Sequence, residues 1–297
     1  MIQTLYHLHT ISALHVGIGQ GTGIIDLPIA REKASNLPQI PGSAIKGVLR
    51  DEMRGQLKDK SRKQLEEDDL LALFGPETGE TASEYAGALA VGDARLLCLP
   101  IRSWQGTFAW ASCPMILRRY QRDLKNDNSI PVPTENSALH CQDTRLKDGN
   151  MIYLEDLDLE TEYQQETEAW AEVVARAFFA DDDWQNLFKQ RFVILTDDVF
   201  DFLAETATEI RARIRIEEGT RTVQSGALWY EEYLPAETLL WGCIASDRPR
   251  KKDYKREKED MLALLPASER LQIGGNATIG AGQVRWILQP QEQAKQA

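Results

Sequence analysis

Several features that mark common protein classes are missing from this sequence of 297 residues. No apolar run approaches the roughly 18 residues needed to cross a membrane. The first residues lack a basic segment followed by an apolar one, so no secretory signal is expected. The four cysteines lie far apart without a CxxC pair, which argues against a zinc cage or a disulfide framework. The sequence therefore predicts a soluble cytoplasmic protein.

Common catalytic and nucleotide-binding motifs are absent as well. There is no GxxxxGK followed by Ser or Thr, no HExxH and no GxSxG, so phosphate-loop, zinc-protease and serine-hydrolase classes gain no support. Residues 17–23 carry glycine at alternate positions, a spacing different from the GxGxxG of dinucleotide folds. His7 and His9 lie on one side of an expected strand, where exposure at a sheet edge explains them better than a metal site.

The excess of acidic residues is local. The chain has 46 acidic and 34 basic residues, a net charge of −12, which alone argues against a nucleic-acid partner. Residues 155–205 hold 15 acidic and 3 basic residues, so the rest of the chain is neutral. Basic runs occur at 46–63 and 248–258. A surface that follows an RNA backbone is therefore compatible with the composition, although a solvated face explains 248–258 better.

Hydrophobic patterning predicts an α+β fold with insertions, because strand-like and helix-like segments are interleaved. Residues 2–11 alternate as in a first strand, and residues 88–99 are typical of another. Helices are expected at 169–179 and 197–210. The polar residues 123–150, with two prolines, are expected to form a loop.

A further helix is expected to begin at Pro41, with Ser43 as its N-cap. Lys46, Arg50 and Arg54 recur at every fourth position and form a basic stripe beside the apolar face. A helix N-terminus next to such a stripe is a good seat for phosphate. Surface solubility explains the stripe equally well. The buried face is expected to comprise Ile45, Val48, Leu49 and Met53.

Basic and apolar residues alternate along 211–216, as in an amphipathic strand. Residues 217–220 are expected to turn the chain, and residues 221–233 to return as a second strand. The pattern predicts a β-hairpin with three arginines on one face, namely Arg211, Arg213 and Arg215.

Four residues have the chemistry needed for acid–base work on a ribose hydroxyl. They are His15, Asp26, Glu231 and Tyr233. Asp26 is a lone acid between apolar residues, and such a carboxylate is more often a turn or cap residue than a catalyst. Glu231 and Glu232 follow an apolar stretch, so one of the two is expected to face inward and the other to face solvent. Spacing along the chain does not establish that the four residues meet.

Five segments resemble proteins of the RAMP superfamily of CRISPR systems. Residues 14–29 and 38–50 resemble the N-terminal half of these proteins, and residues 273–282 resemble their C-terminal glycine-rich loop. Residues 100–110 and 228–235 are similar to segments of one member, the repeated backbone subunit of type III-B (Cmr) RNA-guided effector complexes. The resemblance covers most of the chain.

This resemblance implies a modified RRM-like (ferredoxin-like) palm with insertions, in a single domain over 1–297. It also implies a β-hairpin thumb that wedges into the guide–target duplex, for which 211–226 is the candidate. The acidic, partly helical insertion at 155–205 is expected to face solvent or a basic partner subunit. The implied partners are guide RNA, complementary target RNA, copies of the chain in a filament and the other Cmr subunits.

The resemblance further implies cleavage of bound target RNA at regular intervals, dependent on a divalent metal (Mg or Mn). Asp26 matches the catalytic aspartate, as base or metal holder, and His15, Glu231 and Tyr233 match accessory positions. A ribose 2′-OH would attack the adjacent phosphate, with His15 or Tyr233 donating a proton to the leaving oxygen. The expected RNA contacts are Ser43, Lys46, Arg50, Arg54, Arg211, Arg213, Arg215, Gly274, Gly275, Gly280 and Gly282.

Two other functions stay open at this point. One is a non-catalytic subunit that coats RNA in the same complex, since a single acid does not decide between coating and cutting. The other is a stand-alone endonuclease that processes guide precursors. Such an enzyme is expected to be basic overall, and the sequence pI near 5.0 argues against it.

Overall fold

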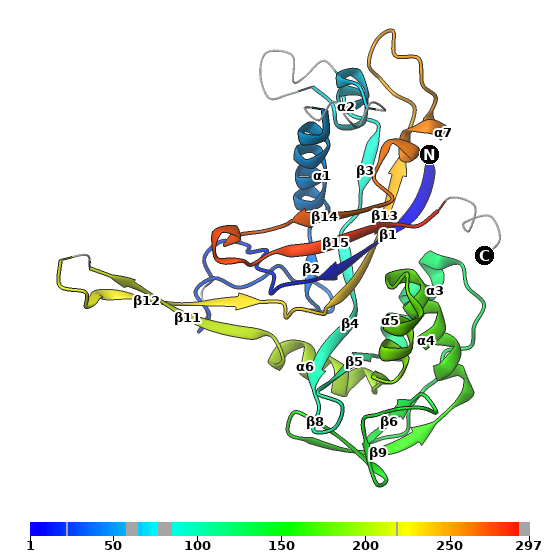
Figure 1. Ribbon diagram of the computed structural model, residues 1–297, viewed down its shortest axis with the longest axis vertical. Helices are drawn as coiled ribbons and strands as arrows, with labels where there is room; N and C mark the ends of the chain where they lie inside the picture. Colours follow the sequence, from blue (N-terminus) through cyan, green and yellow to red (C-terminus); the bar gives the residue numbers. More distant parts are fainter. Residues whose placement is uncertain (22, 58–64, 77–84, 218, 291–297) are drawn as a thin grey trace.

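The computed structural model describes residues 1–290, except residue 22, segments 58–64 and 77–84, and residue 218. Residues 58–63 of the basic run 46–63 and most of the polar C-terminal tail lie outside the described residues. Two lobes are stacked along the longest axis, and a hairpin projects sideways between them (Figure 1). In the described part of the chain, no helix is long and apolar enough to cross a membrane.

Four antiparallel strands form the palm in the lobe that carries the N-terminus. Their order is β15 (Gln283–Leu288), β1 (Ile2–Thr10), β13 (Leu239–Ser246) and β4 (Ala94–Arg102). Helix α1 (Gly42–Leu57) connects β1 to β4, while β13 lies between these two strands. This split βαβ arrangement is typical of a ferredoxin-like fold, so the α+β prediction with a ferredoxin-like palm is confirmed.

Smaller elements complete this lobe. Strand β14 extends the sheet beyond β15, β2 pairs with β4, and β3 pairs with β13. Their bounds, with those of two helices and two short 3-10 turns, are β2 (Gln39–Ile40), β3 (Leu89–Val91), β14 (Ser268–Gln272), α2 (Glu67–Phe74), α7 (Lys258–Met261), η1 (Leu262–Leu264) and η2 (Ala277–Ile279).

Helix α1 begins at Gly42 because of what surrounds its first turn. A Cβ on Gly42 would lie 2.2 Å from the carbonyl oxygen of Val91, so a larger residue does not fit. The N–H of Gly42 donates to Asp93 Oδ1 at 2.7 Å. The expectation that Ser43 is the N-cap is therefore wrong. Ser43 lies exposed inside the first turn, and a carboxylate from a distant segment supplies the capping oxygen.

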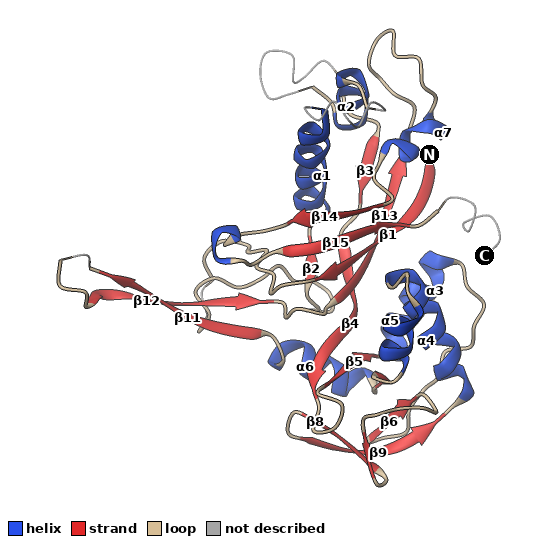
Figure 2. Ribbon diagram, in the orientation of Figure 1, coloured by secondary structure: helices blue, strands red, loops and turns tan. Residues whose placement is uncertain are grey.

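The second lobe continues the same sheet beyond β4. The added strands run in the order β5 (Phe108–Ser112), β10 (Phe192–Ile194), β6 (Ser137–His140), β9 (Leu157–Tyr163), β8 (Met151–Leu154) and β7 (Lys147–Asp148). Most of the helices gather in this half of the molecule (Figure 2). They are α3 (Pro114–Leu124), α4 (Gln165–Phe178), α5 (Asp182–Lys189) and α6 (Asp197–Thr206).

Two sequence-based expectations for this lobe need correction. Residues 123–150 are not a plain loop, because β6 and β7 lie within them. The helix expected at 197–210 ends at Thr206, since Glu209 already begins the next strand. The acidic segment 155–205 supplies strands β9 and β10 as well as helices, so it is built into the lobe.

Strand β1 lies inside the sheet, with β13 on one side and β15 on the other. His7 and His9 are consequently 2% and 3% exposed, and the expectation of edge exposure is wrong. Next to them in β1, Tyr6 stacks on Trp286 with ring centroids 4.8 Å apart. Large buried aromatic side chains of this kind contribute much of the burial that stabilises the core.

The hairpin is a separate two-stranded sheet formed by β11 (Glu209–Ile216) and β12 (Val223–Tyr233). The paired strands predicted from the alternating arginines are confirmed. Arg211 lies opposite Glu231 and Arg213 opposite Trp229. Because opposed residues share a face of a hairpin, the arginines and the side chains of the strand end lie together.

Candidate active site

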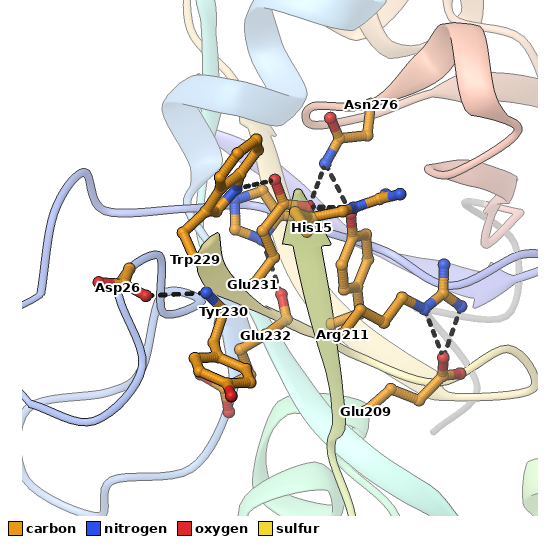
Figure 3. A network of polar contacts seen from close by, with 11 residues as sticks. His15, Asp26, Glu209, Arg211, Trp229, Tyr230, Glu231, Glu232 and Asn276 are labelled. Carbon is orange, nitrogen blue, oxygen red and sulfur yellow. Dashed lines mark hydrogen bonds and ion pairs between the residues drawn. The ribbon is translucent and has the colours of Figure 1, made fainter. Parts of the chain in front are cut away.

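The base of the hairpin, the loop after β1 and the glycine-rich loop near the C-terminus meet at one place (Figure 3). Three consecutive residues of β12, Tyr230–Glu232, each hold a different neighbour. Tyr230 contacts Asp26, Glu231 contacts Asn276, and Glu232 contacts His15. The structure therefore brings His15, Asp26 and Glu231 together, although sequence spacing did not establish it.

Asp26 is fixed by main-chain pairing and has one carboxylate oxygen left over. Its Oδ2 accepts a hydrogen bond from the N–H of Tyr230 at 2.8 Å. Leu27 pairs alongside β12, with its N–H on Tyr230 O at 3.1 Å and its carbonyl on the N–H of Glu232 at 3.0 Å. Asp26 itself is exposed, and Oδ1 makes no hydrogen bond with another described residue. A carboxylate held in this way has one oxygen available to accept a proton or bind a cation.

His15 is buried with its imidazole oriented by one hydrogen bond. Nδ1 lies 2.7 Å from the carbonyl oxygen of Glu232. Because a carbonyl oxygen only accepts, Nδ1 carries the proton, and Nε2 is the nitrogen that gains or loses one. The carbonyl of His15 accepts the N–H of Gly275 at 2.9 Å. Gly274 has φ of +79°, and a Cβ there would lie 2.2 Å from the same carbonyl oxygen.

Glu231 is a buried carboxylate that is surrounded by donors. Its Oε2 accepts from Arg213 Nε at 3.1 Å, Tyr233 Oη at 2.5 Å and Asn276 Nδ2 at 2.9 Å. Its Oε1 accepts from Trp229 Nε1 at 2.9 Å. Burial alone would raise the pKa of Glu231, but the hydrogen bonds from Tyr233, Trp229 and Arg213 outweigh burial and lower this pKa. Glu231 is therefore an ionised anchor.

The Tyr233 hydroxyl is fully engaged. It donates to Glu231 and accepts from Arg213 Nη2 at 3.0 Å and Asn276 Nδ2 at 2.6 Å. Burial and the hydrogen bond to Glu231 raise the pKa of Tyr233. The guanidinium of Arg211 lies over the ring, 4.5 Å from its centroid. A proton held in this way is a poor candidate for transfer to a substrate.

Glu232 is buried like Glu231, so the expectation that one of the two faces solvent is wrong. Glu232 connects the site to the palm. Its Oε1 accepts from Arg31 Nη2 at 2.6 Å and Thr208 Oγ1 at 3.0 Å. Its Oε2 accepts the N–H of Ile29 at 3.0 Å. Since Ile29 follows Asp26 by three residues, Glu232 fixes the segment that presents Asp26.

The basic stripe of α1 is partly occupied by contacts within the protein. Lys46 Nζ donates to the carbonyl of Leu89 at 2.7 Å, and Arg50 Nη2 donates to the carbonyl of Gly75 at 3.0 Å. Burial, and then the nearby Arg50, lower the pKa of Lys46. Arg54 lies 3.8 Å from Asp51. Lys46 and Arg50 therefore brace α1 against its neighbours, and any contact with RNA phosphates would use their remaining donors.

The three hairpin arginines differ in how far contacts within the protein occupy their side chains. Arg211 pairs with Glu209 at 2.5 Å, and Arg213 pairs with Glu231. Arg215 is exposed and forms no ion pair or hydrogen bond with another described residue. Of the three, Arg215 is the cation whose donors are all available to an external anion.

The described residues do not form a metal cage at Asp26. In the part of the chain that the structure describes, no group of three or more His, Cys, Asp or Glu side chains is placed to hold a metal ion. Glu231 and Glu232 lie on the same strand end, but their oxygens are taken by protein donors. These residues therefore do not fit a resident metal.

Sequence reasoning missed two members of this network, Trp229 and Asn276. Both stand inside segments that carry the family resemblance, yet neither has a charge or a motif spacing that marks it. Asn276 has φ of +65°, a conformation that asparagine tolerates better than most residues. This conformational preference is the one sequence feature that singles out Asn276. It does not indicate that Asn276 contacts Glu231, 45 residues away.

The chain is similar to known proteins along most of its length. The family model described as RAMP superfamily matches residues 7–285. The CRISPR system Cmr endoribonuclease Cmr4 of Pyrococcus furiosus is 36% identical over 293 residues, which cover 96% of this chain and 95% of that protein. A crystal structure of oligomeric Cmr4 from Pyrococcus furiosus has a TM-score of 0.70 at 28% identity, covering 97% of this chain and 98% of that one. A cryo-EM structure of Type III-B Cmr-beta bound to cognate target RNA has a TM-score of 0.73 at 19% identity, with 97% of each chain covered, and shares the fold.

Proposed function

The chain belongs to the RAMP superfamily, and from this premise we propose that it is a backbone subunit of a type III-B Cmr effector complex. In this proposal copies of the chain coat guide RNA in the cytoplasm, together with the other Cmr subunits, and cut complementary target RNA. The relative named an endoribonuclease matches the chain along nearly its whole length. The observation that carries the cutting function is the exposed Asp26 carboxylate. Tyr230 fixes it two residues along β12 from Glu232, whose carbonyl orients the buried His15.

The proposed reaction is an attack of a ribose 2′-OH on the adjacent phosphate. The β11–β12 hairpin displaces a target nucleotide, which frees the backbone to reach the in-line geometry; unstacking costs a few kcal/mol. Asp26 Oδ1 accepts the 2′-OH proton as the bond from the 2′ oxygen to phosphorus forms. The bond from phosphorus to the 5′ oxygen breaks, and this oxygen takes a proton from His15 Nε2–H. The products are a 2′,3′-cyclic phosphate and a 5′-hydroxyl.

We assign proton donation to His15 rather than Tyr233. The Tyr233 hydroxyl makes three hydrogen bonds within the protein, whereas none of the bonds that orient His15 uses its Nε2. Glu231 then serves to hold Tyr233, Arg213 and Asn276 in place. Sequence reading is left to guide pairing, as in other RNA-guided complexes.

Any divalent metal needed for cleavage would bind together with the RNA and would not be resident in the protein. The described side chains form no cage for it, but Mg²⁺ is commonly held by one or two carboxylates together with phosphate oxygens. Asp26 would be the protein ligand. Cleavage by the assembled complex in Mg²⁺, in Mn²⁺ and in EDTA tests this part of the proposal. Equal cleavage rates in Mg²⁺ and EDTA would exclude the metal.

The experiment that tests the function compares wild type with Asp26→Asn, each assembled with guide RNA and the other subunits. The asparagine still accepts the N–H of Tyr230, so the local structure is expected to persist. Labelled target RNA should bind equally to both complexes, and only wild type should cut it. Asp158→Asn, which removes an exposed carboxylate from β9 in the other lobe, is the matched control.

A second substrate separates the mechanism from the function. A target with a single 2′-deoxy nucleotide at the scissile position lacks the nucleophile, so it should bind without being cut there. Normal cleavage of this target would contradict the 2′-OH attack. If Asp26→Asn and wild type cut alike, the non-catalytic coating function takes precedence.

A further inference from the structure

Asn276 is the point at which the glycine-rich loop reaches the base of the hairpin. Its side-chain Nδ2 lies 2.9 Å from Glu231 Oε2 and 2.6 Å from Tyr233 Oη. Its backbone carbonyl accepts the N–H groups of Ile279 and Ala281 at 3.1 and 3.3 Å, which closes the loop on itself. A residue with these contacts connects two parts of the chain that are distant in sequence.

The same loop is also attached to His15. Gly275, the residue before Asn276, donates its N–H to the carbonyl of His15 at 2.9 Å. The loop therefore touches both His15 and Glu231, and β12 carries the third connection, from Tyr230 to Asp26. A movement of Glu231 by a fraction of an ångström is shared with Tyr230 and Glu232 through the strand backbone. Tyr230 holds Asp26 and Glu232 holds His15. The distance between Asp26 and His15 therefore depends on where Glu231 lies.

The charges around this contact require an uncharged donor at position 276. Oε2 of Glu231 takes three hydrogen bonds, and the Asn276 amide supplies one of them without adding charge. Among the described residues, Asn276 contacts two titratable groups directly, Glu231 and Tyr233 on β12. Around these two lie Arg213 and Arg211 on β11, the latter over the Tyr233 ring, and His15, whose ring centroid is 5.3 Å from that of Tyr233. An aspartate would place a second carboxylate within about 3 Å of Glu231, a separation at which two carboxylates do not both ionise easily.

We propose that Asn276 is a positioning residue for the cleavage reaction. By bridging Glu231 and Tyr233, its amide sets the distance between Asp26 and His15 across the scissile phosphate. This inference rests on the proposed function, because it concerns the geometry of the same reaction.

The test is the pH profile of three variants in the fully assembled complex, measured as single-turnover cleavage relative to wild type. In Asn276→Asp the two carboxylates share a proton at low pH and repel each other at high pH. Its relative rate should fall about tenfold between pH of about 5.5 and 8.5. Asn276→Ala removes the bridge without adding charge, so its relative rate should be reduced equally at every pH. Asn150→Asp adds the same charge at an exposed turn and should match wild type throughout.

Target binding is measured alongside and should be unchanged in all three variants. A relative rate for Asn276→Asp that does not vary with pH would overturn the proposal. A loss of target binding that accounts for the lost cleavage would overturn it too, since the role would then be structural.

A second measurement does not depend on cleavage. The melting temperature of the Asn276→Asp chain, relative to wild type, should be lower at pH of about 8.5 than at 5.5, and an equal difference at both would contradict the bridge. If wild type cuts no RNA, the proposed function fails by itself while this measurement still tests the contact.

Discussion

The main-chain N–H of Tyr230 binds one oxygen of Asp26 at 2.8 Å and leaves the other oxygen facing solvent. This division of the carboxylate is what distinguishes Asp26 from Glu231 and Glu232, whose oxygens are both taken by protein donors. Glu231 and Glu232 lie at the base of the hairpin, and Asp26 is held against the same place by Tyr230. The one with an available oxygen is the one suited to react with an external group.

His15→Asn should separate orientation from proton transfer. The asparagine amide is able to replace Nδ1–H as the donor to the carbonyl of Glu232, but it has no counterpart of Nε2. Cleavage by the assembled complex should fall at least about a hundredfold, the usual contribution of a general acid. Target binding should be retained in a filter-binding assay. Cleavage within a few-fold of wild type would remove His15 from the mechanism.

Glu232→Gln should destabilise the chain. The substitution breaks a buried ion pair with Arg31 at 2.6 Å and leaves that guanidinium without its counter-charge. Losing one partner of a buried pair typically lowers the free energy of unfolding by about 3 kcal/mol or more. Glu155→Gln breaks the exposed pair with Arg102, and should cost less than about 1 kcal/mol. Urea unfolding measures both, and equal losses would contradict the anchoring role of Glu232.

Gly274→Ala and Gly280→Ala form a matched pair in one loop. Both glycines have positive φ, +79° and +83°, so an alanine is strained at either position, by about 1–2 kcal/mol. At Gly280 nothing lies within 4 Å of the added Cβ, whereas at Gly274 the His15 carbonyl oxygen lies 2.2 Å away. Overpacking should therefore cost Gly274→Ala about 1–3 kcal/mol more. Thermal unfolding with equal losses would show that the loop yields to the clash.

His7 should make stability fall in acid. Burial lowers the pKa of His7 from 6.5 to about 3. Below pH 6.5 the unfolded chain binds a proton at this position, but the folded chain does not until pH approaches about 3. The full stability is therefore present above pH 6.5 and is lost as pH falls, by about 1.4 kcal/mol per pH unit. Urea unfolding of His7→Gln should lack this part of the slope, and parallel curves for the two proteins would contradict it.

Arg215→Gln should weaken guide RNA binding through one phosphate contact. The slope of log affinity against log salt concentration should become shallower by about 0.7–0.9, the value for one released counterion. Arg102→Gln, in the other lobe, should leave the slope unchanged. Titrations between about 50 and 200 mM salt measure both slopes. An unchanged slope for Arg215→Gln would mean that this side chain does not contact a phosphate.

The parts of the fold that follow from local pattern were predictable. Ile45, Leu49 and Met53 are buried on α1 as their spacing indicates, and the alternation of 211–216 identifies a hairpin strand. The cap of α1 was not predictable, because Asp93 reaches Gly42 from 51 residues away. Ser43 is a common N-cap residue, but here the distant carboxylate of Asp93 caps the helix instead.

The position of a strand within a sheet is likewise invisible to local pattern. His7 and His9 alternate as they would on any strand, and only the partners on both sides of β1 decide that they are buried. The candidate site shows the same division. The segment around Asp26 resembles a family motif and so identifies that residue from the sequence. The contact of Asn276 with Glu231 depends on how the loop and the hairpin fold together, which the sequence pattern does not show.

The projecting hairpin has a consequence for the thermodynamics of assembly. Ile210, Ile214 and Leu228 are each about half exposed, at 48%, 49% and 55%, and a two-stranded sheet alone is only marginally stable in water. Amide hydrogens toward its far end should therefore exchange with deuterium quickly in the free chain, while those at its base, locked around Glu231, exchange slowly. When the chain assembles and a neighbouring molecule covers the hairpin, amide exchange should slow along the whole hairpin. Because apolar surface is then removed from water, the heat-capacity change of association should be negative.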